Sequence, residues 1–398
     1  MIPYGKQWIS DQDIDAVVTV LKSDFLTQGP VIPRFEKAFA QKVSSEFAVS
    51  MNSATSALHV ACMALGVGEG DTVWTSPISF VASSNCALYC QATVDFVDID
   101  PLTYNMSASA LEAKLLDAEI NGNLPKVVIP VHLTGQSCDM KAIHALSVKF
   151  GFKIIEDASH ATGASYNGSR VGSCKYSDIA VFSFHPVKII TSGEGGMAVT
   201  NNHKVAIAMT SLRSHGITRD PNLMTIEPDG PWFYQQLELG CNYRMTDIHA
   251  ALGLSQLERL DSFVEQRHSV AKTYFEELKI DSVVLPYQHR DCISSFHLFV
   301  LNFTDSAGPR SQSEVFNRLR ESGVSVNLHY IPIYRHPYYS AMGFERSHFP
   351  EAEIYYQRAI SIPMYPNISE DEQSFVIDVI KSDTSKKFEM PKGFQDLF

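Results

Sequence analysis

The sequence lacks the long apolar runs that a membrane-spanning helix needs. No stretch of about 18 consecutive apolar residues occurs in the chain, whereas about 20 are required to cross a bilayer. The opening residues, Met1 to Lys6, also lack the basic region and apolar core of a secretory signal. We therefore expect a soluble, cytoplasmic protein with no membrane partner.

Positive charge and paired cysteines are also scarce. Lys and Arg number 32 against 44 Asp and Glu, and the formal net charge is -12. A nucleic-acid surface needs a basic patch, so this balance argues against a nucleic-acid partner. The seven cysteines include no C-x-x-C pair, which favours free thiols in a reducing compartment.

Metal-binding and dinucleotide-binding patterns are missing too. The chain contains neither H-E-x-x-H nor a P-loop lysine. Asp95, Asp98 and Asp100 lack the glycine and distal glutamate that complete a calcium loop. The run Gly66 to Gly70 follows a predicted helix, whereas a dinucleotide fingerprint must follow a strand, so we interpret it as a turn. We expect no metal site.

What the chain does contain is a regular alternation of strand-length and helix-length segments. It has 398 residues, 45% of them hydrophobic, which is enough for a large core. The alternation predicts an α/β domain with a mostly parallel sheet, in which ligands bind at the carboxyl ends of the strands. The predicted strands cover Phe47 to Met51, Thr72 to Trp74, Thr93 to Val97, Val127 to Val131, Ile154 to Ile155 and Ile179 to Phe184.

Beyond about residue 260 this rhythm changes, which predicts two domains. We expect a large domain over residues 1–260 and a smaller α+β domain over residues 261–398. The large domain has predicted helices at Asp11 to Leu21, Pro33 to Val43, Ala57 to Leu65 and Asp247 to Leu260. The smaller domain has predicted helices at Glu265 to Leu278 and Ser313 to Glu321, with apolar segments at Ser294 to Asn302 and Val324 to Leu328.

Lys188 stands between the last predicted strand and a glycine cluster. A lysine in a loop is usually a solvated surface charge. Here Gly193, Gly195 and Gly196 let the backbone turn tightly and approach a ligand, and Ser183 and His185 flank the turn. A lysine whose ammonium form is destabilised by burial is the usual amine for Schiff-base chemistry, so Lys188 is a candidate for binding a carbonyl cofactor.

Asp157 ends the apolar segment Phe152 to Ile155 and precedes Lys188 by 31 residues. A carboxylate at the end of a buried strand needs a cation or several hydrogen-bond donors to stay ionised. A protonated pyridine nitrogen is such a cation. The alternative is a structural Asp that caps the following turn, and the residues alone leave both interpretations open.

The runs Phe182 to Lys188 and Thr191 to Gly196 resemble the cofactor-lysine signature of the DegT-type sugar aminotransferases. The similarity extends over most of the chain. It implies a fold-type I transferase that depends on pyridoxal phosphate (PLP). Within the family the sequence is most similar to transaminases that act on a UDP-linked 4-keto-6-deoxy-N-acetylhexosamine in pseudaminic acid biosynthesis.

The resemblance also implies roles for residues that would otherwise be ordinary. Ala54 and Thr55, which could equally be plain helix-cap residues, match the family's phosphate-binding residues, together with Ser183 and an Asn242 that reaches the partner subunit's cofactor. The implied cofactor-binding set is Ala54, Thr55, Phe80, Asp157, His160, Ser183, Lys188 and Asn242. The implied substrate-binding set is Tyr4, Asp24, Phe25, Leu26, Thr27, His185, Arg213, His215, His329, Tyr330, Ile331, Pro332 and Tyr334.

We therefore expect a homodimer with shared active sites that moves an amino group in two half reactions. The resemblance implies glutamate as the donor and the sugar ketone as the acceptor. Asp157 would keep the pyridine nitrogen protonated while the Lys188 amine shuttles a proton. Alternatives are an aminotransferase for another nucleotide 4-keto or 3-keto sugar, a sugar dehydratase, and a non-catalytic nucleotide-sugar-binding regulator. The dehydratases have histidine where this chain has Lys188, and no basic helix-turn-helix supports a regulator.

Overall fold

A seven-stranded sheet forms the centre of the protein, whose computed structural model describes residues 1–304 and 312–385. The strand order is β1-β9-β8-β5-β4-β2-β3. All neighbouring pairs are parallel except the two that include β9, so the predicted mostly parallel sheet is confirmed. The strands are β1 (Phe47–Met51), β2 (Thr72–Thr75), β3 (Thr93–Phe96), β4 (Val127–Ile129), β5 (Lys153–Asp157), β8 (Ile179–Ser183) and β9 (Gly196–Thr200).

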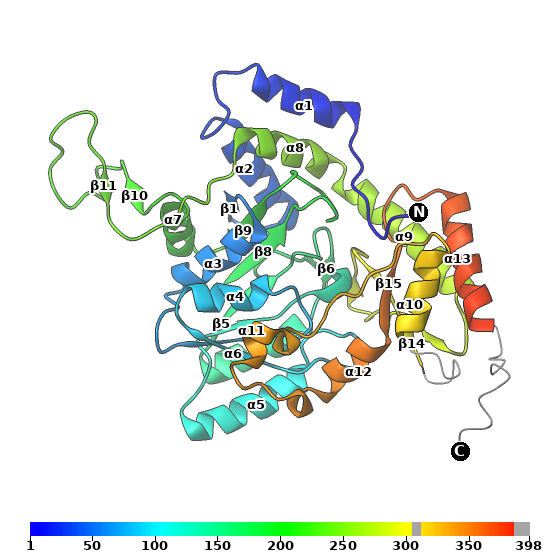
Figure 1. Cartoon of the computed structure of the whole chain (residues 1–398). Helices are drawn as coiled ribbons and strands as arrows, with labels where there is room; N and C mark the ends of the chain where they lie inside the picture. The colour runs from blue at the N-terminus through cyan, green and yellow to red at the C-terminus, as the bar shows by residue number, and fades with distance from the viewer. Residues whose placement is uncertain (305–311, 386–398) are drawn as a thin grey trace.

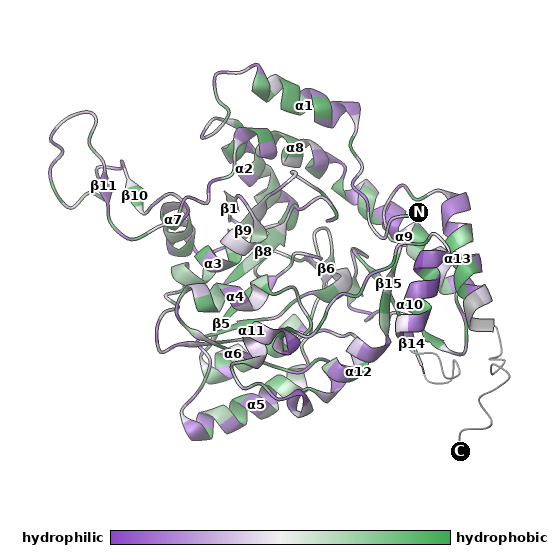
Figure 2. Ribbon diagram, viewed as in Figure 1, coloured by the Kyte–Doolittle hydropathy of each residue, from purple (hydrophilic) through white to green (hydrophobic). Residues whose placement is uncertain are grey.

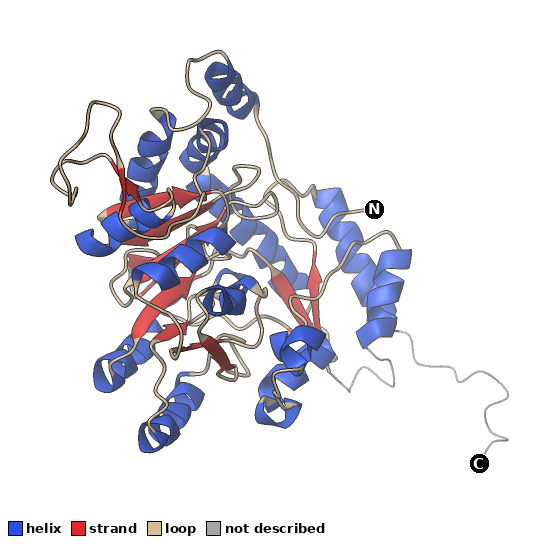
Figure 3. Ribbon diagram, turned by 60° about the vertical axis from the view of Figure 1, so that its left-hand side comes forward, coloured by secondary structure: helices blue, strands red, loops and turns tan. Residues whose placement is uncertain are grey.

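Helices cover both faces of this sheet (Figures 1 and 3). Side chains alternate along β8, so that Ile179 and Val181 pack with α3 and α4, whereas Ala180 and Phe182 pack with α2 and α8. A strand buried on both faces is a continuous apolar run, which is why β8 could be predicted. The helices of this part are α1 (Asp11–Leu21), α2 (Val31–Val43), α3 (Ala54–Ala64), α4 (Ala82–Tyr89), α5 (Ala108–Asn121), α6 (Met140–Phe150), α7 (His203–Leu212) and α8 (Asp247–Glu258).

A smaller part is built around the antiparallel sheet β12-β14-β15. Its strands are β12 (Val283–Val284), β14 (Phe299–Phe303) and β15 (Ala359–Ile362), and its helices are α9 (Leu260–Glu277), α10 (Gln312–Glu321) and α13 (Glu370–Ser385). The first residues of the chain join it, because Ile2 donates a backbone hydrogen bond to Gly323 and Tyr4 accepts one from Met364. The α+β class is confirmed, and a domain boundary at residue 260 stays a prediction.

The long segment after α10 returns to the central sheet before it reaches β15. Tyr334, Tyr339, Phe349 and Tyr355 pack into the same apolar cluster as α3 and α4. Figure 2 shows hydrophobic residues along the central strands and hydrophilic ones on α10 and α12. Further elements of residues 1–304 and 312–385 are β6 (Ser165–Tyr166), β7 (Ser169–Arg170), β13 (Cys292–Ile293), α11 (Pro337–Ser340), α12 (Pro350–Arg358) and short 3-10 turns at Leu133–Gly135, Ile333–Arg335 and Arg346–His348. Across residues 1–304 and 312–385, no helix combines the length and the apolar character of a membrane span.

Between α7 and α8 the chain leaves the body as an arm, residues 214–242, that projects from one side (Figure 1). Its only regular structure is the pair β10 (Ile217–Thr218) and β11 (Gln235–Gln236). Six large apolar side chains of the arm are exposed, namely Leu223, Ile226, Trp232, Tyr234, Leu237 and Leu239. So much exposed apolar surface on a thin segment is typical of a contact with another protein chain.

Candidate active site

Lys188 lies in a tightly held loop after β8. Its backbone N–H donates to the His185 carbonyl at 2.9 Å, and the Thr191 hydroxyl donates to the Phe184 carbonyl at 2.9 Å. Burial disfavours the charged ammonium and lowers the pKa of Lys188 to about 8, although the negative charge of Asp157 acts in the opposite direction. The lysine is therefore a partly buried amine that loses its proton near neutral pH.

Asp157 ends β5, the strand beside β8, where its Cα pairs with that of Val181. The side chain is only 5% exposed. Its Oδ2 accepts a hydrogen bond from the Ser83 hydroxyl at 2.6 Å, and its Oδ1 accepts one from the Ser159 backbone N–H at 3.1 Å. Two donors compensate for the burial of the carboxylate and leave it room to accept a third hydrogen bond.

The N-terminus of α3 forms a seat for an anion. The Ser53 hydroxyl caps the Ser56 N–H at 3.1 Å, and the N–H groups of Ala54 and Thr55 belong to the first turn, which has no partners within the helix. A Cβ on Gly196 would lie 2.4 Å from the Ser53 carbonyl oxygen and 2.5 Å from the Ala54 nitrogen. Only glycine therefore lets α3 begin so close to the sheet.

Gly196 also joins this seat to the lysine strand. In the sheet it pairs with Met51 on one side and with Ser183 on the other. Ser183 is buried, and its hydroxyl oxygen accepts a hydrogen bond from the His185 backbone N–H at 3.5 Å. The start of α3 and the end of β8 therefore lie next to each other on either side of Gly196. This arrangement brings together Ala54, Thr55 and Ser183, the predicted phosphate ligands of one chain.

Buried histidines and a tyrosine form another wall. His160 Nε2 is 3.1 Å from the Tyr330 hydroxyl, and the two rings are stacked. Burial, and then the positive charge of Lys188, lowers the pKa of both histidines. The pKa of His329 falls to about 3. Both imidazoles are therefore neutral and act as hydrogen-bonding groups. Among the described residues, none is a hydrogen-bond partner for His160 Nδ1, which leaves this atom available to a bound group.

Other predicted site residues lie at or near this wall. The Tyr4 ring lies 5.3 Å from that of His329, and the Phe80 ring lies 6.2 Å from that of Tyr330. Phe80 is 58% exposed, so one face of the aromatic group is open. His185 is exposed beside the lysine loop, as is Ile331 beyond Tyr330, whereas Pro332 is buried.

A second group of predicted residues surrounds the base of the arm. Asn242 is exposed and forms a bridge with Ser214, next to His215. The exposed loop Asp24 to Thr27, which includes the predicted residues Asp24, Phe25, Leu26 and Thr27, is fixed to the start of α8. Its Thr27 bridges to Thr246, and the Leu26 carbonyl accepts the Asp247 N–H at 3.0 Å. Nothing in the single chain places Asn242 against Lys188.

Two predicted substrate residues already have structural partners. The Arg213 guanidinium pairs with Glu36 at 2.5 Å and donates to the Ser50 carbonyl at 2.7 Å. Tyr334 is 1% exposed, and its hydroxyl donates to Glu353 at 2.7 Å. These contacts hold both side chains within the chain's own packing, so the substrate roles of Arg213 and Tyr334 stay predictions that their surroundings do not favour.

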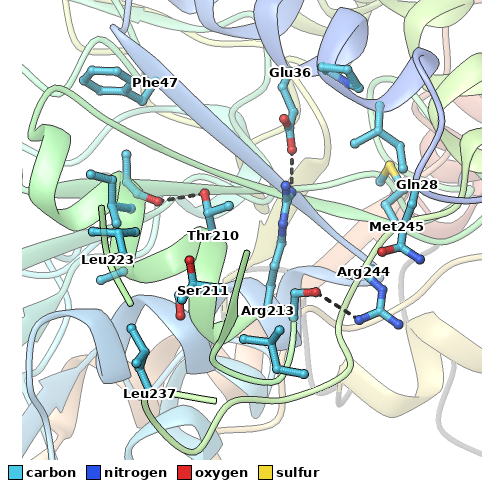
Figure 4. A pocket seen from close by; sticks show the side chains of 18 of the residues that line it. Gln28, Glu36, Phe47, Thr210, Ser211, Arg213, Leu223, Leu237, Arg244 and Met245 are labelled. Atoms are coloured by element: carbon cyan, nitrogen blue, oxygen red, sulfur yellow. Dashed lines mark hydrogen bonds and ion pairs between the residues drawn. The ribbon is translucent and has the colours of Figure 1, made fainter. Parts of the chain in front are cut away.

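A cleft of about 900 Å³ opens between α2, α7 and the arm, away from the lysine site (Figure 4). Glu36, Arg213, Leu223, Leu237 and Arg244 are among the residues that line it. Figure 4 shows Arg213 directed to Glu36 and Arg244 to a neighbouring hydroxyl, that of Ser214, 3.0 Å away. Neither Lys188 nor Asp157 lines this cleft, so we assign the chemistry to the lysine site.

Sequence reasoning missed Ser83 and His297. Ser83 is fully buried against Asp157, and the His297 ring lies 4.3 Å from that of His160. No local pattern marks either residue, because Ser83 is 74 positions from Asp157 and the histidines come from different parts of the chain. The only local signal is that Ser83 follows the predicted ring-stacking Phe80 by one helical turn.

The residues of the lysine site fit PLP. Lys188 would supply an amine for the aldehyde, Asp157 an acceptor for the protonated pyridine nitrogen, and the start of α3 donors for the phosphate. Together with the mixed seven-stranded sheet, these features define the class of fold-type I PLP-dependent aminotransferases. The DegT/DnrJ/EryC1/StrS aminotransferase family matches residues 7–381, and the chain belongs to this family.

Similar proteins agree with this assignment. The chain is 36% identical over 396 residues to the UDP-4-amino-4,6-dideoxy-N-acetyl-beta-L-altrosamine transaminase of Campylobacter jejuni, covering 99% of this chain and 100% of that one. It is also 36% identical over 383 residues to the spore coat polysaccharide biosynthesis protein SpsC of Bacillus subtilis, covering 96% of each.

Solved structures show the same fold. Helicobacter pylori PseC, an aminotransferase involved in the biosynthesis of pseudoaminic acid, superimposes with a TM-score of 0.88 at 28% identity over 96% of this chain and 99% of that one. The PLP form of Spr1654 from Streptococcus pneumoniae has a TM-score of 0.85 at 26% identity, covering 96% and 98%. The predicted family, fold, enzyme class and cofactor are confirmed.

Proposed function

We propose that this nucleotide-sugar aminotransferase moves an amino group from glutamate to the 4-keto position of a UDP-linked 4-keto-6-deoxy-N-acetylhexosamine, in pseudaminic acid biosynthesis. The observation that carries the chemistry is that Lys188, in the loop after β8, lies close enough to Asp157, at the end of the adjacent strand β5, for the charge of the carboxylate to act on the amine. The choice of sugar rests on similarity to the altrosamine transaminases and to PseC over nearly the whole chain.

The residues of the site divide the work of binding and proton transfer. When bound, PLP supplies an electron sink for the carbon next to the migrating amine. Asp157 would hold the proton on the pyridine nitrogen, and the N-terminus of α3 with Ser183 would bind the phosphate. His160 and Tyr330 are neutral, and the hydrogen bond between them fixes both side chains where they would orient the cofactor ring. Phe80 would pack against the face of that ring.

Lys188 performs the proton transfer. With PLP bound, the Lys188 amine would take the proton from the donor carbon that carries the amino group and deliver it to the cofactor carbon that receives this group. In the second half reaction it would move a proton from that cofactor carbon to the sugar carbon that accepts the amine. A pKa near 8 suits both directions, because the amine can accept a proton and give it up again close to neutral pH. An ordinary solvated lysine would hold its proton too tightly.

We further propose that the active sites are shared within a homodimer. Asn242 and His215 lie at the base of the arm rather than beside Lys188 of the same chain, and the arm carries exposed apolar side chains such as Trp232 and Leu239. Pairing of two chains about a twofold axis would cover these side chains and bring Asn242 to the other chain's phosphate seat.

The substrate is tested with a panel of UDP-linked and dTDP-linked 4-keto sugars, each assayed with glutamate. We expect the highest kcat/KM for the UDP-linked 4-keto-6-deoxy-N-acetylhexosamine. Faster turnover of a dTDP sugar without the N-acetyl group, or of a 3-keto sugar, would overturn the choice of substrate and leave the aminotransferase class intact.

The role of Asp157 is tested with Asp157→Asn, which keeps the shape of the side chain but cannot hold the pyridinium proton. We expect kcat for the donor half reaction to fall roughly 100-fold or more, with a smaller effect on PLP affinity. Glu156→Gln is the matched control, because Glu156 is equally buried on β5 but bonds to His132 and Ser177. Normal turnover of folded Asp157→Asn would contradict the role.

A further inference from the structure

Ser83 lies where it can fix the orientation of the Asp157 carboxylate. It belongs to the first turn of α4 and is fully buried. Its hydroxyl oxygen is 2.6 Å from Asp157 Oδ2 and 2.7 Å from the hydroxyl oxygen of Ser79. The Phe80 carbonyl is the other possible acceptor for Ser83, but at 3.3 Å it is the weaker one.

The direction of these hydrogen bonds follows from the chemistry of the carboxylate. An ionised Asp157 can only accept, so the Ser83 proton points to Oδ2, and the Ser79 hydroxyl must then donate to the Ser83 oxygen. The separation of 2.6 Å is that of a charge-assisted hydrogen bond between a hydroxyl and a carboxylate. The two serines and the aspartate form a chain of donors that ends on the negative charge.

Ser83 and Ser159 fix the carboxylate from two sides. Ser159 belongs to the turn after β5 and holds Oδ1, whereas Ser83 comes from a helix on one face of the sheet and holds Oδ2. A carboxylate held at both oxygens by separate elements cannot rotate freely. Each oxygen retains a lone pair for a third donor, and a pyridine N–H is such a donor.

We propose that Ser83 is a positioning residue that fixes the orientation of Asp157, so that its carboxylate can accept a hydrogen bond from the protonated pyridine nitrogen of the cofactor during amino transfer. The proposal rests on the role of Asp157 given above. A hydrogen bond to one carboxylate oxygen restricts rotation of the whole group. Without Ser83, the carboxylate could turn away from the ring nitrogen and would stabilise the proton there less well.

A structural role is the alternative, and the neighbouring residue provides the control for it. Ser84 is also fully buried on α4, but its hydroxyl bonds to that of Tyr339 at 2.7 Å. Ser83→Ala and Ser84→Ala each remove one buried hydroxyl from the same helix. Only Ser83→Ala removes a donor to Asp157, whereas Ser83→Thr keeps it.

The experiment measures the protonation of the bound ring directly. The holoenzyme is prepared with PLP labelled with ¹⁵N in the ring, and the nitrogen chemical shift is followed with pH, beside kcat and the PLP Kd. For Ser83→Ala we expect the ring nitrogen to lose its proton at lower pH than in the wild type. We expect kcat of the donor half reaction to fall about 10-fold to 100-fold, the range for loss of one hydrogen bond to a charged group, with little change in Kd.

Ser83→Thr should restore both signals, and Ser84→Ala should lower the melting temperature without moving the nitrogen shift. A Ser83→Ala enzyme with wild-type nitrogen titration and wild-type kcat would overturn the proposal. If Ser83→Ala does not fold, Ser79→Ala removes the outer donor instead, and a ring nitrogen that titrates as in wild type would then overturn it. Normal turnover of Asp157→Asn would reject the role of Asp157 itself, which separates the two failures.

Discussion

At the scale of single residues, Lys188 and Asp157 can be singled out from the sequence, whereas the side chains around them cannot. Lys188 and Asp157 each follow an apolar run that is buried as a strand, and such runs are visible in the sequence. Ser83 and His297 reach the site only because α4 and the segment before β14 fold against it. Contacts between distant parts of a chain leave no local pattern, so these neighbours of the site are found only in the structure.

The lowered pKa of Lys188 predicts how its reaction with PLP depends on pH. Burial disfavours the ammonium form, so the fraction of neutral amine should rise about tenfold per pH unit up to about pH 8 and level off above it. We expect the cofactor-free protein to form a borohydride-reducible adduct with PLP at a rate that follows this curve. Peptide mass analysis should locate the adduct on Lys188, and Lys188→Ala should form none.

Two outcomes would contradict this prediction. A rate that keeps rising to about pH 10 would indicate an ordinary solvated lysine. An adduct on Lys175 or Lys204 would mean that another amine carries the cofactor. Both lysines are on this chain and serve as internal controls in the same digest.

At the scale of elements, the sequence predicts strands at β1, β2, β3, β4, β5 and β8, whereas it does not predict β9 or the regular helices α5, α6 and α13. The bounds of α1 match the prediction, and α3 begins at Ala54 rather than Ala57. β9 was not predicted, because its first residue, Gly196, belongs to the glycine cluster that reads as a turn. The apolar segment from Val324 to Leu328 forms only isolated bridges, to Ile2 and Ser361.

The missed strand supplies the next prediction. Gly196→Ala places a methyl group against the backbone at the start of α3, at distances that real Cβ atoms do not adopt. The helix must move away from Ser183, at a cost of about 1–3 kcal/mol for overpacking. We expect a lower melting temperature and a PLP Kd raised about 10-fold or more.

A control variant and a ligand without phosphate show whether the loss of affinity comes from the phosphate contacts. A Cβ on Gly68, in the turn after α3, meets nothing within 4 Å, so Gly68→Ala should leave Tm and Kd unchanged. Pyridoxal, which lacks the phosphate, should bind Gly196→Ala almost as it binds the wild type. Equal losses for PLP and pyridoxal would show that the α3 terminus does not bind the phosphate.

At the scale of the whole molecule, the sequence predicted two parts but neither the arm nor the way the start of the chain joins the smaller part. Residues at the start of the chain form backbone hydrogen bonds with Gly323 and Met364 of that part, because backbone groups need hydrogen-bond partners. The arm has almost no regular structure of its own. Contact with a second chain would explain why the arm exposes the apolar side chains of Trp232 and Leu239.

Complementation between two inactive variants tests the shared site. If each site needs Lys188 from one chain and Asn242 from the other, Lys188→Ala and Asn242→Ala homodimers are both impaired. A heterodimer of the two holds one intact site and one site with both lesions. After mixing by partial unfolding, activity should therefore rise above either parent, towards half of the wild-type value per heterodimer. Mixing Lys188→Ala with Asp157→Asn is the control, because these lesions fall in different sites and no site is restored. Recovery in the control as well, or heterodimers without activity in the first mixture, would show that Asn242 does not serve the partner's site.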